Sequence, residues 1–187
     1  MEALQITEDS VLRPYVEGDA AELTEVVAAN REHLARWVPW AASYGYEAAV
    51  EYIASAIAKI EADAGFEGAI VHDGKIVGGA GCHQVDWLNR TTAIGYWLAA
   101  DVRGLVTATV RALLDHAFGV WDLHRVVIEV VPDNQRSKAI PERLGFRQEA
   151  VLREAKLIGG RFEDALLYAM LASEWAASTA RGAIGSE

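Results

Sequence analysis

The stretch Ile94-Gly95-Tyr96-Trp97-Leu98, followed by Ala99 to Gly104 and then by Leu105 to Phe118, decides how this chain folds. Its first five residues are typical of a short apolar strand, and the turn after them carries Arg103. From Leu105 onward, apolar residues recur at three- and four-residue spacing, which predicts a helix with one buried face. A strand that passes directly into a helix directs unpaired backbone N–H groups at one point. The stretch therefore predicts an anion-binding site, to which Arg103 adds a positive charge.

The composition is typical of a folded enzyme or binding protein. Because the chain has 187 residues, of which 52% are hydrophobic, we expect a single domain over residues 1–187, with a core at about 10–175 and a flexible tail at 176–187. The net charge of −10 argues against nucleic acid or a membrane as partner and favours an amine. With no signal peptide, no membrane-spanning run and Cys82 as its only cysteine, the chain is expected to be cytoplasmic, without disulfides or a bound metal.

The residues before the central stretch predict a strand, two helices and a hairpin. Val11–Val16 is expected to be an edge strand, because Pro14 cannot donate to a sheet ladder. Asp19 and Glu22 have the spacing of a capping box, which predicts a helix to about Ala29. Further along, the sequence predicts a helix at Tyr46–Ala64 and a hairpin of Phe66–Val71 and Ile76–Cys82 about Asp73-Gly74.

The residues after the central stretch predict a buried strand, a helix and a last hairpin. The strand is Arg125–Val131, and the helix after it has Asn134 or Asp133 as its cap and ends at Gly145. The hairpin consists of Val151–Ile158 and Phe162–Leu171, and the chain is expected to fray beyond Trp175. This order of elements predicts an α+β protein with a mixed sheet.

Three stretches resemble the GNAT superfamily of N-acetyltransferases, and within it the branch that acetylates ribosomal-protein N-termini. They are His33-Leu34 through Trp40, Ile94–Leu98 and, most specifically, Asn134-Gln135-Arg136-Ser137-Lys138-Ala139-Ile140-Pro141-Glu142-Arg143-Leu144-Gly145-Phe146. The resemblance covers roughly residues 10 to 175. It implies the GNAT fold, with a mixed, mostly antiparallel sheet of about seven strands and helices on both faces. It also implies acetyl-CoA as cosubstrate and direct attack by a primary amine in a ternary complex.

The resemblance further implies roles for particular residues. The central strand and the Arg125–Val131 strand should splay apart, so that main-chain groups near Trp97 bind the pantetheine arm and polarise the thioester carbonyl. Asn134 would bond the pantetheine amides, and Ser137 would protonate or stabilise the leaving thiolate. Alternatively, Asn134 is only a helix cap and Ser137 an ordinary first-turn serine. The implied coenzyme-binding residues are Tyr96, Trp97, Leu98, Arg103, Gly104, Leu105, Val106, Thr107, Asn134 and Ser137.

The acceptor is less defined by the sequence than the coenzyme. Aromatic residues and one histidine are candidates for the acceptor pocket: Trp37, Trp40, His83, Trp87 and Tyr168. The tryptophans could instead be core or lid packing. The acceptor could be a ribosomal-protein N-terminus, a polyamine, an aminosugar or an antibiotic, and another acyl donor such as succinyl-CoA is also open.

Two features depart from the family pattern. The turn around Arg103 and Gly104 looks about two residues short and lacks a second glycine, which predicts either weakened coenzyme binding or a loop that closes by unwinding the first turn of the helix. Ala93 stands where many relatives carry a glutamate that serves as general base. In place of that glutamate, Glu129 is a candidate general base. It could be a semi-buried base, or it could instead form an ion pair with Arg125 or Arg147. The remaining alternatives are His83, Asp164, Glu154 or a chain of water molecules.

Two functional hypotheses follow from these observations. The first is an acyl-CoA-dependent N-acetyltransferase with Ser137, and less securely Glu129, as catalytic residues. The second is a catalytically degenerate GNAT-fold protein that binds a ligand without turnover, in keeping with the short loop and Ala93. A nucleic-acid binder is contradicted by the charge. The sequence leaves a homodimer open.

Overall fold

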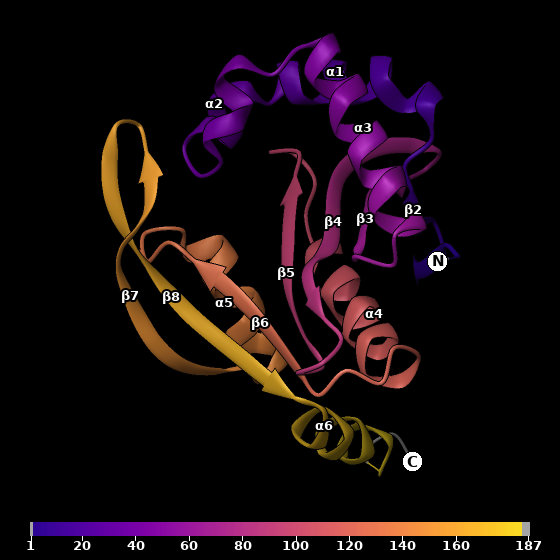
Figure 1. The fold of residues 1–187 in the computed structure, drawn as a ribbon, viewed down its shortest axis with the longest axis vertical. Helices are drawn as coiled ribbons and strands as arrows, with labels where there is room; N and C mark the ends of the chain where they lie inside the picture. The colour runs from indigo at the N-terminus through magenta and orange to yellow at the C-terminus, as the bar shows by residue number, and fades with distance from the viewer. Residues whose placement is uncertain (1, 185–187) are drawn as a thin grey trace.

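The computed structural model describes residues 2–184 and has one open sheet of eight strands in the order β1-β2-β3-β4-β5-β6-β8-β7 (Figure 1). All neighbouring strands are antiparallel except β5 and β6, which are parallel. The predicted mixed, mostly antiparallel sheet is therefore confirmed, with one strand more than expected. The strands are β1 (Leu4–Thr7), β2 (Ser10–Pro14), β3 (Phe66–His72), β4 (Lys75–Asp86), β5 (Thr91–Leu98), β6 (Arg125–Val130), β7 (Arg147–Ile158) and β8 (Arg161–Leu171).

Helices cover both faces of this sheet, as expected. Buried side chains form two clusters, and β3 contributes to both because its side chains alternate between the faces. Ile70 packs in the cluster that includes α4, while Ala69 packs in the cluster that includes α1 and α3. The helices are η1 (Glu17–Asp19), α1 (Ala20–Ala29), α2 (Arg31–Ala35), η2 (Pro39–Ser43), α3 (Tyr46–Glu61), α4 (Leu105–Gly119), α5 (Gln135–Leu144) and α6 (Ala172–Ile184).

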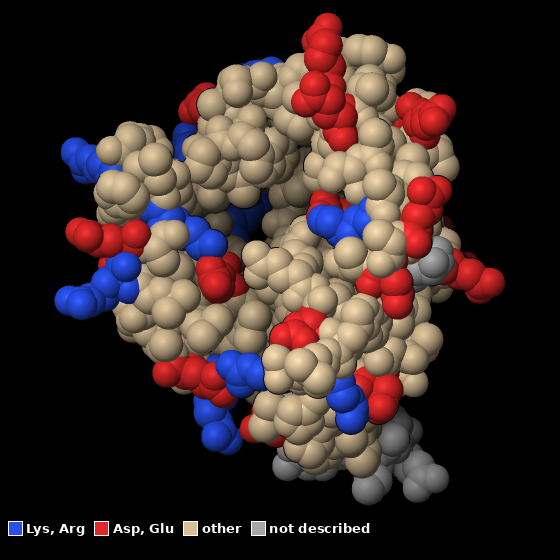
Figure 2. Space-filling view, in the orientation of Figure 1, with Lys and Arg blue, Asp and Glu red and all other residues tan. Residues whose placement is uncertain are grey.

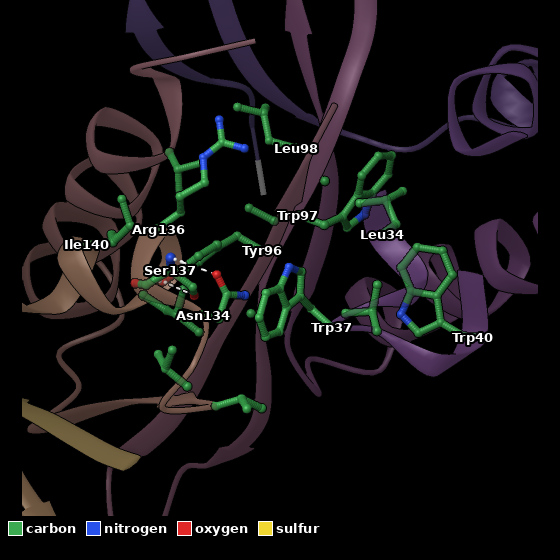
Figure 3. Close-up of a pocket in the computed structure, with 18 of the residues that line it drawn as sticks. Leu34, Trp37, Trp40, Tyr96, Trp97, Leu98, Asn134, Arg136, Ser137 and Ile140 are labelled. Carbon is green, nitrogen blue, oxygen red and sulfur yellow. Dashed lines mark hydrogen bonds between the residues drawn. The ribbon is translucent and has the colours of Figure 1, made fainter. Parts of the chain in front are cut away.

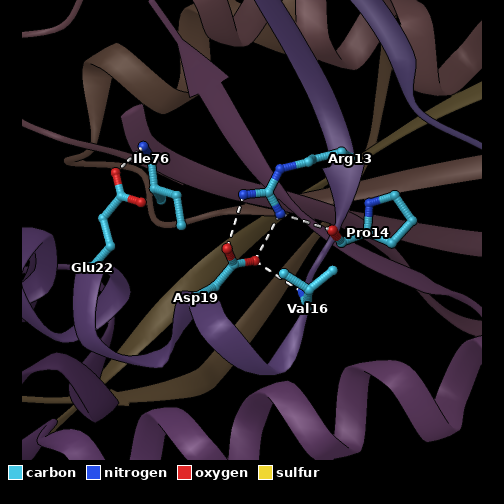
Figure 4. Close-up of polar contacts among 6 residues, drawn as sticks. All are labelled: Arg13, Pro14, Val16, Asp19, Glu22 and Ile76. Atoms are coloured by element: carbon cyan, nitrogen blue, oxygen red, sulfur yellow. Dashed lines mark hydrogen bonds and ion pairs between the residues drawn. The ribbon is translucent and has the colours of Figure 1, made fainter. Parts of the chain in front are cut away.

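The start of the chain differs from its prediction in two respects. β2 is an inner strand, because the short strand β1 pairs with it and forms the edge. Asp19 does not cap α1 through its side chain. Its carboxylate instead accepts hydrogen bonds from the guanidinium of Arg13 and the backbone N–H of Val16, as Figure 4 shows. Glu22, the other half of the predicted capping box, accepts from the backbone N–H of Ile76 and so connects α1 to β4.

The end of the chain is more regular than expected. The chain continues beyond Trp175 as α6 to Ile184, a helix that the sequence did not predict. Trp175 is buried, and its indole N–H donates to Asp115 on α4 at 2.8 Å. The part of the expected tail at 185–187 lies outside the described residues. Within 2–184, no helix combines the length and apolarity needed to cross a membrane, and no three His, Cys, Asp or Glu side chains gather as metal ligands.

Candidate active site

The sheet opens between β5 and β6. These strands pair only where Thr91–Ala93 face Arg125–Val127, whereas β5 stays paired with β4 as far as Leu98. Beyond Ala93, one edge of β5 therefore has no strand beside it, which is the splay that the resemblance implied. A cavity of about 1100 Å³ extends from this gap, and Figure 2 shows the hollow at the surface.

The start of α4 lies at the cavity. Gly104 has φ of +82° in the left-handed region, and no side chain caps the helix that follows it. The first-turn N–H groups of a helix have no acceptor within it, so they carry a partial positive charge. Arg103, Val106 and Thr107 line the cavity with Gly104, while Leu105 packs in the hydrophobic core. The backbone donors and the cation expected of an anion site therefore lie together at this end of the cavity, and the side chain of Leu105 packs away from it.

The start of α5 faces the same cavity from the other side of the gap (Figure 3). Asn134 caps this helix by accepting from the backbone N–H of Ser137 at 3.1 Å, and this bond leaves the side-chain NH2 of Asn134 available to a ligand. The Ser137 and Tyr96 hydroxyls lie 3.2 Å apart. Burial raises the pKa of Tyr96 to about 12, so Tyr96 stays protonated at neutral pH. The Ser137 hydroxyl donates to that of Tyr96, and Tyr96 in turn donates to the backbone carbonyl of Ser137, so the cavity holds two neutral hydroxyls in one short hydrogen-bond chain.

Two arginines of α5 also line the cavity, and neither was singled out from the sequence. Arg136 and Arg143 are seven residues apart, which places them on one face of the helix, two turns from each other. Arg143 donates to the Thr107 hydroxyl at 3.0 Å and so connects α5 to the first turn of α4. The helical spacing could have identified both residues. Together with Arg103, they make this part of the cavity cationic in a protein whose net charge is −10.

Only part of the predicted acceptor wall lies at the cavity. Trp37 and Trp40 line it, and Trp40 packs edge-on against Trp97 with a centroid distance of 6.0 Å. Trp87 instead packs against Trp121 outside the cavity. Tyr168 is only 2% exposed, in the core, and its hydroxyl donates to Glu142.

The Glu129 side chain lines the cavity but forms an ion pair that the sequence did not predict. Lys156 on β7 lies 2.7 Å from its carboxylate. The expected partners are engaged elsewhere, Arg125 with Glu149 and Arg147 with Glu174. Glu129 does form an ion pair, as predicted, but with a different partner. Lys156 lies on β7, which pairs with β8 and not with β6, so nothing in the sequence indicated that it approaches Glu129.

The remaining candidate bases differ in where they lie. His83 lines the cavity and contacts Glu67 on β3, at 3.0 Å between His83 Nδ1 and Glu67 Oε1. Glu154 donates its backbone N–H to Asp164 in the β7–β8 hairpin, and neither residue is among those that line the cavity. Sequence reasoning missed Glu67, although a lone acidic residue within the apolar run Phe66–Val71 is a usable signal.

Comparisons with known proteins agree with this geometry. The family model described as acetyltransferase (GNAT) domain matches residues 10–147. The chain is 31% identical over 178 residues to the putative ribosomal N-acetyltransferase YdaF of Bacillus subtilis (strain 168), covering 91% of this chain and 96% of that protein. A solved probable acetyltransferase has a TM-score of 0.89 at 30% identity, covering 92% of this chain and 98% of the other.

A second solved structure shows the ligands of a related protein. It is the self-immunity acetyltransferase MccE in complex with acetyl-CoA and AMP, with a TM-score of 0.85 at 25% identity, covering 89% of this chain and 94% of that chain. The family model spans well over half of the present sequence, and the first relative matches it almost end to end. The chain therefore belongs to the GNAT family of acetyltransferases.

Proposed function

We propose that this protein transfers the acetyl group of acetyl-CoA to a primary α-amine, with the N-terminus of a protein as the favoured acceptor and a small amine as the alternative. One observation carries the proposal: an uncapped helix start, an unpaired strand edge and the Asn134–Ser137–Tyr96 cluster share one cavity. The relative named as a putative ribosomal N-acetyltransferase supports a protein acceptor. An activity on ribosomal proteins would place the protein in the cytoplasm.

The coenzyme would lie along the gap between β5 and β6. The N–H groups at the start of α4, with Arg103 and Arg136, would hold the pyrophosphate by charge-assisted hydrogen bonds. The free edge of β5 near Trp97 would bond the pantetheine arm and polarise the thioester carbonyl, as an oxyanion site does. The hydroxyl of Ser137, which donates to Tyr96 in this structure, would turn its hydrogen toward the departing sulfur and protonate it.

The acceptor would enter along the aromatic side of the cavity. Trp37, Trp40 and Trp97 present ring faces and edges there. Aromatic faces attract ammonium groups and also pack against apolar side chains. This wall suits a flexible peptide end that carries a positive α-amine.

The first test is a thioester-consumption assay with acetyl-CoA, using N-terminal peptides and a panel of small amines. We expect turnover with at least one class, and a fall in kcat of about 100-fold in Ser137→Ala, as expected for loss of a general acid. Ser178→Ala, on α6 away from the cavity, is the matched control and should keep the activity. No turnover together with no coenzyme binding would overturn the proposal in favour of the catalytically degenerate alternative.

The second test concerns the short turn before α4. Isothermal titration with acetyl-CoA should show binding weaker than micromolar, because a shorter turn presents fewer N–H groups to the pyrophosphate. Arg136→Ala should weaken the binding a further tenfold or more, about the value of one charge-assisted hydrogen bond. Arg161→Ala, at the exposed β7–β8 turn, should leave it unchanged. Ordinary micromolar binding would show that the turn length has no effect.

A further inference from the structure

His83 lies where β5 and β6 part. It faces Ala93 across the β4–β5 ladder, and Ala93 is the last β5 residue that also pairs with β6. The imidazole ring lies over Gly95, because a Cβ atom on Gly95 would be 2.7 Å from His83 Nε2. The ring also lines the cavity. An imidazole nitrogen is therefore available next to the unpaired edge of β5.

Glu67 fixes the orientation of this ring. Its Oε1 atom is 3.0 Å from His83 Nδ1, and the same carboxylate forms an ion pair with Lys59 on α3. Only 8% of the Glu67 side chain is exposed, against 35% for His83. Because an ionised carboxylate can only accept, Nδ1 carries the hydrogen, and the lone pair of neutral imidazole is then on Nε2. The clamp of Glu67 and Lys59 thus leaves Nε2 free to accept a proton.

Glu67 itself is not suited to accept that proton. Burial alone would raise the pKa of its carboxyl, but hydrogen bonds with His83, Lys59 and Tyr52 lower it to about 2. A group with so low a pKa cannot hold a proton taken from an ammonium near neutral pH. Burial also raises the pKa of Tyr52, which remains a neutral donor. The charges around His83 are thus those of Glu67 on β3 and Lys59 on α3, and the facing β5 residues carry none.

The other titratable side chains suited to the role are less well placed. Glu129 is held by Lys156 at 2.7 Å. His33 on α2 also lines the cavity, but among the described residues no hydrogen bond orients its ring. His83 therefore combines exposure to the cavity with a fixed tautomer.

We propose that His83 is the general base of the reaction and that Glu67 and Lys59 are its positioning residues; this inference rests on the proposed function. The Nε2 atom of His83 removes one proton from the acceptor ammonium, and the freed lone pair attacks the thioester carbonyl carbon. The C–N bond forms and the C–S bond breaks. Ser137 gives its hydroxyl proton to the departing sulfur and takes back the second proton that the nitrogen loses, and the proton on His83 passes to solvent. The base thus lies on β4, opposite Ala93 of β5. Ala93 is the position at which the family pattern has a glutamate.

The test compares His83→Asn with His33→Asn and with His124→Gln, a change at an exposed histidine outside the cavity. The side-chain amide that His83→Asn introduces keeps a donor near the position of Nδ1, so the bond to Glu67 can persist while Nε2 is lost. We expect kcat to fall about 100-fold or more in His83→Asn, with the KM for acetyl-CoA unchanged within a factor of about 2. Its rate should keep rising with pH where the wild-type rate levels off, because solvent hydroxide then removes the proton. The other two variants should retain the wild-type pH profile.

A second variant separates chemistry from structure. His83→Ala leaves a space beside Glu67, and added imidazole should restore its activity at least tenfold, with no effect on Ser137→Ala. Any of three results would overturn the assignment. They are a wild-type kcat in His83→Asn, a fall in kcat in His33→Asn instead, and a His83→Ala enzyme whose activity imidazole does not restore. A wild-type protein without activity on any amine would instead overturn the proposed function, so the two failures are distinguishable.

Discussion

At the scale of single residues, one buried carboxylate connects β2 to the first helical turn. Asp19 is 5% exposed and accepts two bonds from Arg13, at 2.7 and 2.9 Å, and one from the Val16 N–H. We expect Asp19→Asn to lower the free energy of unfolding by about 3 kcal/mol, because the partly buried Arg13 loses its counterion. Glu32→Gln, which breaks the exposed pair with Arg36, should change it by about 0.5 kcal/mol at most. Urea unfolding measures both, and equal effects would contradict this account.

Glu67 should make stability depend on acid pH. Its pKa is about 2 in the folded protein and 4.5 for an ordinary glutamate. A carboxyl whose pKa is depressed by folding contributes stability above its unfolded pKa, and this contribution is lost as pH falls through the folded pKa. The stability advantage of wild type over Glu67→Gln should therefore shrink between about pH 4.5 and pH 2. Urea unfolding at a series of pH values checks this, and a constant difference would contradict it.

A candidate site residue could be predicted from the sequence where its role depends only on residues close to it in the chain. Asn134 was predictable as a helix cap, because capping needs only neighbours in sequence. Trp87 and Tyr168 were assigned to the acceptor wall and lie away from the cavity, since the direction of a side chain follows from strand register and partners far along the chain. The partner of Glu129 was missed for the same reason. Lys156 belongs to the β7–β8 hairpin, and the sequence does not show how that hairpin lies relative to β6.

At the scale of elements, the glycines of β4 allow the cavity wall to form. A Cβ atom on Gly79 would lie 2.6 Å from both the Trp97 indole nitrogen and the Tyr15 hydroxyl. Gly79→Ala should therefore displace Trp97 and raise the KM of the acceptor about tenfold or more, since misplaced site groups are costly. Gly119→Ala, where the added atom meets nothing within 4 Å, should leave the KM unchanged. Kinetics with the best acceptor measures both, and unchanged KM in Gly79→Ala would show that Trp97 does not contact the acceptor.

Long elements with strong periodicity were predictable, and short or paired ones were less so. The helices α3 and α4 and both glycine-turn hairpins follow from apolar spacing and turn residues. The strand β1 has only four residues, too few to show alternation, and its presence turned the expected edge strand into an inner one. The helix α6 was missed because small residues beyond Trp175 carry little periodic signal.

At the scale of the whole molecule, acetyl-CoA should connect the parts of the sheet on either side of the gap. A ligand that binds only the folded state stabilises it, by about 2.7 kcal/mol at 100 times its Kd. We expect acetyl-CoA to raise the Tm and to slow hydrogen exchange in β5, at the start of α4 and in α5 together. Inorganic pyrophosphate, which lacks the pantetheine arm, should protect the starts of α4 and α5, which supply its proposed contacts, and leave β5 unprotected. Protection confined to one side of the gap with acetyl-CoA would contradict the proposed position of the coenzyme.

The single parallel pair in the sheet has a consequence for how specificity can change. From β5 the neighbouring strands run back toward the N-terminus, and from β6 they run on toward the C-terminus, so the gap is a topological switch point. Ligands of open sheets bind beyond the carboxyl ends of strands at such points. The coenzyme position that we propose would thus be set by the connection β5–α4–β6, while α2, η2 and the β7–β8 hairpin add the outer walls of the cavity. Substitutions in those walls should therefore change which acceptor is used, while the position of the acetyl group stays fixed by the β5–α4–β6 connection.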